Sequence, residues 1–352
     1  MRRGWTTGAC AAAAARAAME ALLTGRFPDP VAIRLPGGER PAFPLALTEV
    51  DEGRARAGIV KDAGDDPDVT HGALVVAEVA PGPPGSGLTF HAGAGVGTVT
   101  LPGLALAVGE PAINPGPRAM IAEAIADAIE ACDSPSRDVA VTISIPGGEA
   151  LAAKTLNGRL GIVGGLSILG TTGVVIPYSC SSWIHSIQRG IDVARAAGLS
   201  HLAACTGSTS EAAVRRLLGL PEIALIDMGD FVGGTLKYLR RHPIERLTLA
   251  GGFGKMAKLA AGHLDLHSAR SEVDIAALAD LLDELGGTGE AVAAARQARS
   301  AGALLDIAGD AKRALTERVA RRAREVALAT LAGSTSIDVM LIDRRGELLA
   351  RA

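Results

Sequence analysis

The feature that most limits what this sequence can fold into is a run from residue 160 to residue 184 without one charged side chain. The run, LGIVGGLSILGTTGVVIPYSCSSWI, contains no Asp, Glu, Lys, Arg or His. A membrane span is the first possibility for such a run, because a bilayer accepts about 20 consecutive apolar residues. Pro177, Tyr178, the polar block 179–182 and repeated glycines interrupt the apolar pattern, so we expect no membrane span.

We expect this run to form a buried strand, a loop and then a helix. Residues 161–163 predict the strand, and Ser181 or Ser182 is suited to cap a helix that carries Ile184, Ile187 and Ile191. Between them, glycine can bring bare backbone close to a ligand because it has no Cβ. Glycine-rich turns are equally common as packing loops in α/β proteins, so the stretch alone leaves both possibilities open. The ligand hypothesis predicts that the cofactor is bound by Gly164, Gly165, Thr171, Thr172 and Gly173.

The composition argues against several kinds of partner. The net charge is −3 and 3% of the residues are aromatic, so we expect neither a nucleic-acid surface nor binding to an anionic membrane. No two of the four cysteines form a CxxC pair, which disfavours a zinc knuckle or a redox motif. Unpaired thiols are typical of the reducing cytoplasm. We therefore predict a cytoplasmic protein without a metal site, and a homo-oligomer stays open.

In residues 154–289, strand-like apolar runs alternate with helical segments. The predicted strands end in polar, glycine-containing loops: TGSTS from residue 206, DMGD from 227 and GGFGK from 251. Such repetition predicts a doubly wound parallel sheet, which binds ligands at the carboxyl ends of its strands. Such loops are suited to bind a nucleoside, because glycine lets the backbone approach the ligand closely and a carboxylate can accept hydrogen bonds from the ribose hydroxyls. The residues predicted to face it are Thr206, Gly207, Asp227, Gly251 and Gly252.

These loops carry no standard nucleotide fingerprint. No GxGxxG motif opens a helix, and GGFGK lacks the spacing of a phosphate-binding P-loop. An NAD-dependent dehydrogenase and an NTPase are therefore disfavoured.

The rest of the chain predicts a second, α+β domain. Short strands and amphipathic helices occupy the first 153 residues, and strands 337–342 and 347–350 form a closing hairpin around Arg344, Arg345 and Gly346. We expect this hairpin to return to the sheet of the first half. The predicted fold class is therefore α+β and α/β in two domains. An α+β domain, residues 1–153 completed by 290–352, is interrupted by an inserted Rossmann-like α/β domain, residues 154–289.

Polar clusters outside these loops are further candidates. Asp62, Asp65 and Asp66 crowd a Gly/Pro loop, which is either a solvated acidic turn or a source of catalytic acids and bases. The EF-hand spacing is absent, so calcium is disfavoured. His263 and His267 would share one face of a helix, but without a third ligand we favour substrate contacts over zinc.

Three prolines hold residues 109–118 extended and rigid. Such a segment is suited to present Asn114 and Arg118 at fixed positions. We therefore include both as candidates for substrate binding.

Several separate motifs, in order along the chain, resemble one known family. They are GWTTGACAAAAARAA, KDAGDDPDVTHG, GEPAINPGPR, GLSILGTTGVV, TGSTSE, MGDFVGG and LAGGFGKMAKLAAGHLDLHS. Together they are similar to the cobalt-precorrin-5B C1-methyltransferases of the CbiD type. This resemblance implies transfer of a methyl group from S-adenosylmethionine to C1 of a corrin precursor, with or without cobalt, in cobalamin biosynthesis. Residues 178–183 depart from it, because relatives often carry a more acidic stretch there.

The resemblance also implies a polycarboxylate tetrapyrrole as the substrate, and carboxylates need cations. The basic candidates are Lys61, Arg118, Arg159, Lys255 and Lys258, together with the polar residues Asn114, His263 and His267. Asp62, Asp65 and Asp66 are the candidates for proton handling. A tetrapyrrole carrier without catalysis and an NAD-dependent reductase of the same pathway are the alternatives.

Overall fold

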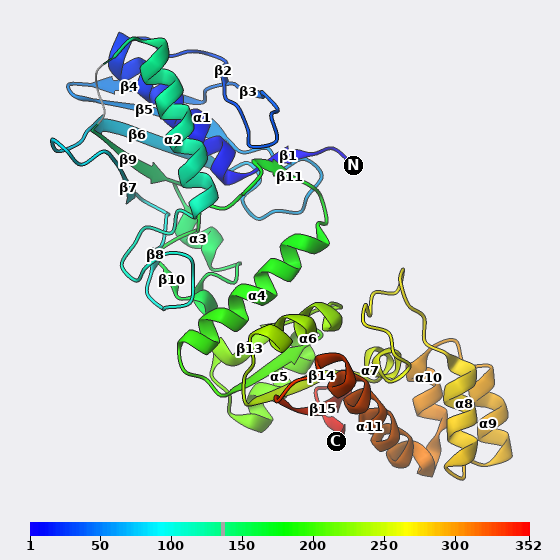
Figure 1. Ribbon diagram of the computed structural model, residues 1–352. Coiled ribbons are helices and arrows are strands. Elements are labelled where there is room, and N and C mark those ends of the chain that lie inside the picture. Colours follow the sequence, from blue (N-terminus) through cyan, green and yellow to red (C-terminus); the bar gives the residue numbers. More distant parts are fainter. Residues whose placement is uncertain (135–137) are drawn as a thin grey trace. The chain divides into compact units, whose positions relative to one another are not determined.

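The computed structural model describes residues 1–134 and 138–352 and divides them into two compact units, Met1–Ser179 and Cys180–Ala352. Each unit has its own hydrophobic core and its own five-stranded sheet. The predicted mixed α/β chain of two domains is confirmed. Figure 1 shows the elements of each unit.

The first unit is a mostly antiparallel sheet with two helices packed on one face (Figure 1). Buried residues alternate with partly exposed ones along β9, so that one side of this strand faces the helices. The strand order is β4 (Leu47–Asp51), β5 (Arg54–Val60), β6 (Leu74–Pro81), β9 (Val139–Ser144) and β7 (Leu88–Ala92).

Helix α1 (Thr7–Thr24) is the central element of this unit. The Thr6 hydroxyl caps it by accepting from the Ala9 N–H at 3.2 Å, and Gly25 ends it in the left-handed region at φ 74°. Its alanine tract is fully buried, because small side chains let the helix pack closely on β5, β6 and α2 (Pro115–Ala131). Helix α1 is thus the alanine-rich core helix of this unit.

Short strands hold the remaining segments of the first unit. Two of these pairs, β1 (Gly4–Trp5) with β11 (Val174–Val175) and β8 (Thr98–Val99) with β10 (Ile162–Val163), are antiparallel. A third pair joins β2 (Val31–Ala32) to β3 (Ala42–Phe43), and α3 (Gly148–Ala152) follows β9.

The uncharged run contains the predicted strand, at Ile162–Val163, but this strand is not part of the parallel sheet. It pairs with β8 in the first unit, and α4 (Cys180–Ala196) then begins the second unit. None of the described helices is both long and apolar enough to span a bilayer.

The second unit is a doubly wound sheet with helices on both faces. Its order is β13 (Leu225–Asp227), β12 (His201–Cys205), β14 (Arg246–Gly252), β15 (Ser336–Ile342) and β16 (Leu348–Arg351). The first four strands are parallel and only β16 is antiparallel; the sequence predicts parallel pairing for β12, β13 and β14 but not for β15.

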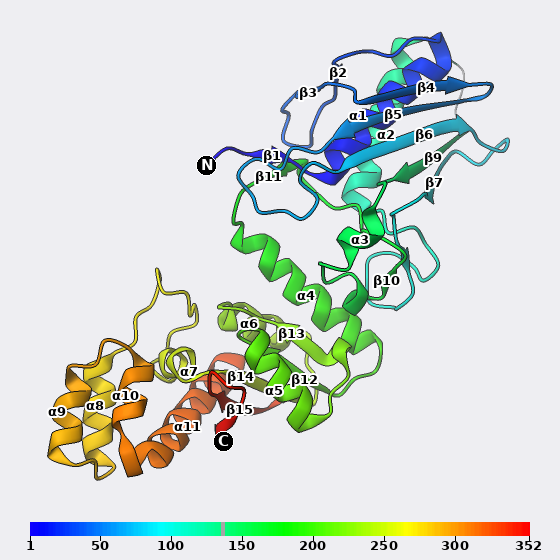
Figure 2. The ribbon, with the colours of Figure 1, turned by 180° about the vertical axis from the view of Figure 1, so that it is seen from behind.

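Side chains alternate between the two faces of this sheet. Leu202 and Ala204 pack into the larger core with α4, α6 (Val232–Arg241), α7 (Phe253–Ala260) and α11 (Lys312–Leu331). Ala203 and Cys205 pack on the opposite face with residues of α5 (Ser208–Leu218), and Figure 2 shows the ribbon of α5 beside the strands of this sheet. Three further helices, α8 (Ile275–Glu284), α9 (Gly289–Arg296) and α10 (Ala301–Ile307), complete the larger core.

The predicted return of the closing hairpin to the first half is wrong. β15 lies in parallel register with β14 from Ser336 beside Arg246 to Ile342 beside Gly252, so residues 290–352 complete the second unit. The unit boundary falls between residues 179 and 180, rather than at 153, and the α/β unit is not an insertion. The physical reason is that β15 is buried on both faces, which an interior parallel strand requires.

Candidate functional site

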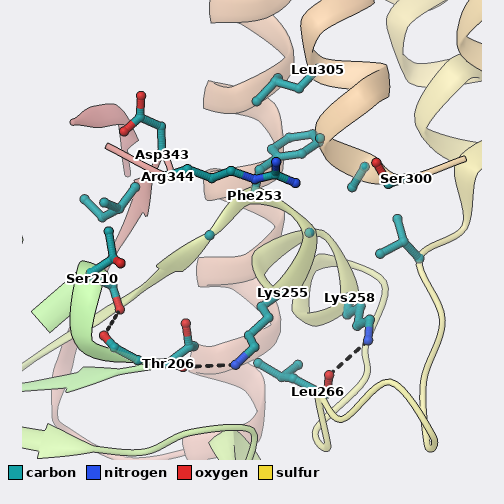
Figure 3. A pocket seen from close by; sticks show the side chains of 18 of the residues that line it. Thr206, Ser210, Phe253, Lys255, Lys258, Leu266, Ser300, Leu305, Asp343 and Arg344 are labelled. Atoms are coloured by element: carbon teal, nitrogen blue, oxygen red, sulfur yellow. Dashed lines mark hydrogen bonds between the residues drawn. The ribbon is translucent and has the colours of Figure 1, made fainter. Parts of the chain in front are cut away.

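The second unit contains a cavity of about 1550 Å³ at the carboxyl edge of its parallel sheet. The chain runs from β12 through α5 to β13 on one side and through α6 back to β14 on the other, so the switch point lies between β12 and β14. The loops after both strands line the cavity, as does the turn after β15 (Figure 3). The predicted location of a ligand site at this edge is therefore matched by a cavity.

Two helices begin at this edge without a capping side chain. Gly207 precedes α5 and Gly252 precedes α7, and neither helix start receives a side-chain cap. The Ser210 hydroxyl donates to the Gly207 carbonyl oxygen at 2.8 Å instead. Because first-turn N–H groups have no partner inside a helix, they can donate to polar or anionic ligand atoms.

The two predicted lysines line this cavity but already have partners. The Lys255 ammonium donates to the Thr206 carbonyl oxygen at 2.9 Å and lies 3.0 Å from Asp230 Oδ1, which joins the loops after β12 and β14. The Lys258 side chain is buried and donates to the Leu266 carbonyl oxygen at 2.9 Å (Figure 3). Both lysines therefore fix loops at the cavity.

Of the two histidines predicted to contact the substrate, only one lies at the cavity. His267 lines the cavity, and its Nδ1 accepts from the Ala269 N–H at 3.1 Å, whereas His263 is exposed and lies outside the lining. Across residues 1–134 and 138–352, no group of three or more His, Cys, Asp or Glu side chains is arranged to hold a metal ion.

Of the residues of this unit that are predicted to face a nucleoside, some line the cavity and others do not. Thr206, Gly207 and Gly252 line the cavity. Gly251 lies behind the lining, where an added Cβ would come within 2.7 Å of Thr206 Oγ1 and Met256 Cε. Asp227 ends β13 outside the lining, and its carbonyl oxygen accepts from the Trp183 indole at 3.2 Å.

The glycines and threonines predicted from the uncharged run all belong to the first unit. A Cβ on Gly165 would lie 2.3 Å from the backbone of Gly95, and one on Gly173 would lie 2.6 Å from Leu35. The Thr172 hydroxyl forms a turn with Val174, and Thr171 packs against Gly116. Gly164 adopts a left-handed φ of 87°. The structure thus gives these residues packing and turn contacts within the first unit.

The acidic loop of the first unit holds the N-terminal segment. Arg2 forms an ion pair with Asp62, and its backbone N–H donates to Asp65 at 2.5 Å. Asp66 accepts from the Tyr178 N–H at 2.9 Å. Hydrogen bonds from Arg2 and from the Gly64 N–H lower the pKa of Asp62 to about 2. A carboxyl group with so low a pKa stays ionised at neutral pH and is a poor proton donor.

The remaining candidates also lie in the first unit and make local contacts. The Lys61 side chain is only 1% exposed, pairs with Asp68 and donates to Thr70 Oγ1 at 2.8 Å, so it does not lie at a rim. Asn114 donates to the Ile168 carbonyl oxygen at 3.1 Å. Arg118 donates to the Ile113 carbonyl oxygen at 2.7 Å and to Glu110 at 3.0 Å. Arg159 lies in the short helix Gly158–Leu160.

Sequence reasoning missed the cavity residues that follow position 290. The wall contributed by this segment includes Arg299, Ser300, Lys312, Arg344 and Arg345. A signal was present, because the apolar strand 337–342 ends in DRRG just as the earlier strands end in polar loops. The sequence pattern predicts this segment in the other domain, and it therefore does not predict that the polar loop lies at this edge.

Comparisons with known proteins agree over the whole chain. Residues 1–177 match the CbiD family model, and residues 265–352 match the model described as CbiD, C-terminal domain. A Paramagnetospirillum magneticum protein is 62% identical, over 100% of this chain and 98% of its own length. A Bradyrhizobium protein is 59% identical, over 100% and 93%. Both are named cobalt-precorrin-5B C(1)-methyltransferase.

Among solved structures, a cobalamin biosynthesis protein (CbiD) from Archaeoglobus fulgidus is 29% identical with a TM-score of 0.41, covering 77% of this chain and 83% of that one. The family assignment comes from the matched models and from the relatives aligned along the full chain. By these matches, the chain belongs to the CbiD family.

Proposed function

We propose that this protein methylates C1 of cobalt-precorrin-5B, or of its metal-free equivalent, in cobalamin biosynthesis. The observation that carries the proposal is the 62% identity, over the full chain, to a relative with that name. S-adenosylmethionine is the proposed methyl donor. The transfer breaks the bond between sulfur and the methyl carbon, and the electron pair of a ring carbon forms the new C–C bond. The sulfonium thereby becomes a neutral thioether.

The donor is proposed to bind at the switch point of the second unit. Thr206, Gly207 and Gly252 line this edge, and the uncapped starts of α5 and α7 offer N–H groups to the carboxylate and hydroxyls of the donor. Typical small-molecule pockets measure about 300–1,000 Å³. The cavity of about 1550 Å³ therefore has room for a donor and part of a macrocycle. Catalysis would rest mainly on holding both ligands in line and excluding water.

The direct test is incubation of the purified protein with methyl-labelled donor and the ring-contracted precursor, in cobalt-bearing and metal-free forms. Mass spectrometry should show one labelled methyl group on the ring product. Tight ring binding without labelling would instead indicate a tetrapyrrole carrier. Reduction of the ring with NADH and no labelling would indicate a reductase.

Gly252 offers a sharp test of the donor location. The nearest atom to an added Cβ is the Ile342 carbonyl oxygen at 4.0 Å, so a side chain fits there without displacing the backbone. Gly252→Leu should fill part of the cavity and weaken binding of S-adenosylhomocysteine at least about tenfold, as measured by calorimetry. The control is Gly289→Leu, where nothing lies within 4 Å of an added Cβ and the position is outside the cavity. Equal affinities for both variants would contradict the location.

A further inference from the structure

One wall of the cavity carries basic side chains that do not fix its loops. Arg299 precedes α10, Lys312 begins α11, and Arg344 and Arg345 form the turn after β15. Within the part of the chain that the structure describes, none of these four side chains makes a hydrogen bond or an ion pair. They differ in this respect from Lys255 and Lys258, whose ammonium groups are bound to backbone carbonyl oxygens.

A rigid turn presents Arg344. The Asp343 carboxylate accepts from the backbone N–H groups of Arg345 and Glu347, each at 2.8 Å. The Arg216 guanidinium donates to the Gly346 carbonyl oxygen at 2.7 Å and thereby ties the turn to α5. The backbone of Arg344 is thus fixed although its own side chain makes none of these contacts.

The Arg344 side chain reaches into the cavity. Figure 3 shows it extending from the turn toward Phe253 and the start of α10. Its Nη2 lies 3.4 Å from the position that a Cβ on Gly302 would occupy. The guanidinium therefore lies close to the start of α10, beside the cavity, although the residue as a whole is exposed.

Within the described residues, no carboxylate of the cavity forms an ion pair with these four basic side chains. Asp230 lies beside Lys255, and Asp343 is occupied by the turn, which leaves Glu272 and Asp306 among the acidic lining residues. Guanidinium groups bind carboxylates through two parallel hydrogen bonds, and in a cavity such bonds are stronger than at an open surface. The wall is therefore suited to a ligand with several carboxylates.

We propose that Arg344, supported by Arg299, Lys312 and Arg345, binds the peripheral carboxylates of the tetrapyrrole substrate. This inference rests on the proposed function, and it places the macrocycle in the same cavity as the donor, against the basic side chains of this wall. Arg344 is a binding residue for the ring, and the carboxylate of the donor is not its ligand.

The test compares full-length wild type with Arg344→Gln and with the control Arg321→Gln, an exposed arginine of α11 outside the cavity. The probes are cobyrinic acid, a corrinoid with free carboxylates, cobinamide, a corrinoid with amides in their place, and S-adenosylhomocysteine. Affinities are measured by calorimetry at low salt, and circular dichroism checks folding. Arg344 is exposed and unpartnered, so its replacement should leave the fold intact.

We expect Arg344→Gln to weaken binding of cobyrinic acid about tenfold, the effect of losing one charge-assisted hydrogen bond. Arg321→Gln should bind it like the wild type, and neither substitution should change the affinity for S-adenosylhomocysteine. Cobinamide should bind weakly and equally to all three proteins. Added salt should reduce the difference between wild type and Arg344→Gln for cobyrinic acid.

Unchanged binding of cobyrinic acid in Arg344→Gln would overturn the inference, as would an effect confined to S-adenosylhomocysteine. Failure of the wild type to bind cobyrinic acid while it binds S-adenosylhomocysteine would also overturn it. The labelled methyl transfer by the wild type is measured separately. If the wild type transfers the methyl group and Arg344→Gln binds cobyrinic acid with normal affinity, this inference is wrong and the proposed function stands. If Arg344→Gln weakens the binding of cobyrinic acid but the wild type transfers no methyl group, the proposed function is wrong.

Discussion

At the scale of single residues, Asp62 in the loop after β5 is a candidate catalytic residue whose contacts in the structure are structural. Asp62 lies at the surface beside Arg2, which fixes the N-terminal segment next to β1 and β11. Its pKa falls from 3.8 to about 2 because the folded state donates hydrogen bonds to the ionised form. The pair therefore contributes stability above pH 4, and this contribution is lost as the pH falls toward 2.

Asp62→Asn should remove this acid-sensitive contribution. The variant should be slightly less stable than the wild type at neutral pH, and the difference should shrink between pH 4 and pH 2. Trp5 lies in the first unit, so its fluorescence during urea unfolding in a Trp183→Phe background reports on this unit alone.

The control for Asp62→Asn is Asp51→Asn, which removes an exposed carboxylate of β4 that makes no hydrogen bond or ion pair within the described residues. It should leave the pH profile unchanged. The assignment fails if Asp62→Asn retains the full acid dependence of the wild type.

At the scale of elements, the loops of the first unit are joined by close backbone contacts at glycines. Gly165 packs on Gly95, Gly116 packs on Thr171, and Gly8 in the first turn of α1 faces Leu169. The glycine-rich part of the uncharged run therefore connects β8, β10 and the starts of α1 and α2. This close packing of backbone on backbone is sufficient to explain why these positions are glycines, and no bound ligand is needed to explain them.

Gly165→Ala should destabilise the first unit by about 1–3 kcal/mol, the usual range for overpacking a dense core. The added Cβ would lie 2.3 Å from backbone atoms of Gly95, which cannot rotate away as a side chain could. Urea unfolding monitored through Trp5 measures the change. Gly158→Ala, where nothing lies within 4 Å, should shift stability by less than about 0.5 kcal/mol. A Gly165→Ala variant that is as stable as the wild type but does not bind S-adenosylhomocysteine would instead support the hypothesis that the glycines of the uncharged run bind the cofactor.

At the scale of the whole molecule, the lining of the cavity belongs entirely to the second unit. Its residues extend from Thr206 to Leu349, and the cores of this unit are formed within Cys180–Ala352. A segment with its own core and its own sheet is expected to fold by itself.

Residues 180–352, expressed alone, should therefore fold and bind S-adenosylhomocysteine with an affinity close to that of the full chain. Circular dichroism and thermal unfolding test folding, and calorimetry tests binding, with Gly252→Leu in the same fragment as the negative control. A folded fragment that does not bind, beside a full chain that does, would contradict a donor site formed by the second unit alone.

Local sequence was sufficient to predict much of the architecture. The spacing of Ile184, Ile187 and Ile191 predicted a helix, which the structure has at Cys180–Ala196. Apolar runs that end in polar loops predicted the parallel strands at His201–Cys205 and Arg246–Gly252. Helix starts and strand ends depend on nearby residues, so short patterns identify them. Separate motifs along the chain also identified the family.

Only the tertiary structure decided which unit each segment joins. Strand pairing is a long-range choice, and nothing near residues 336–342 in the sequence specifies that their neighbour is β14. For the same reason, glycines that pack on each other near Gly165 could not be told from glycines that line a cavity near Gly252. A missing Cβ admits a ligand or another backbone equally well, and the folded chain determines which of the two lies there.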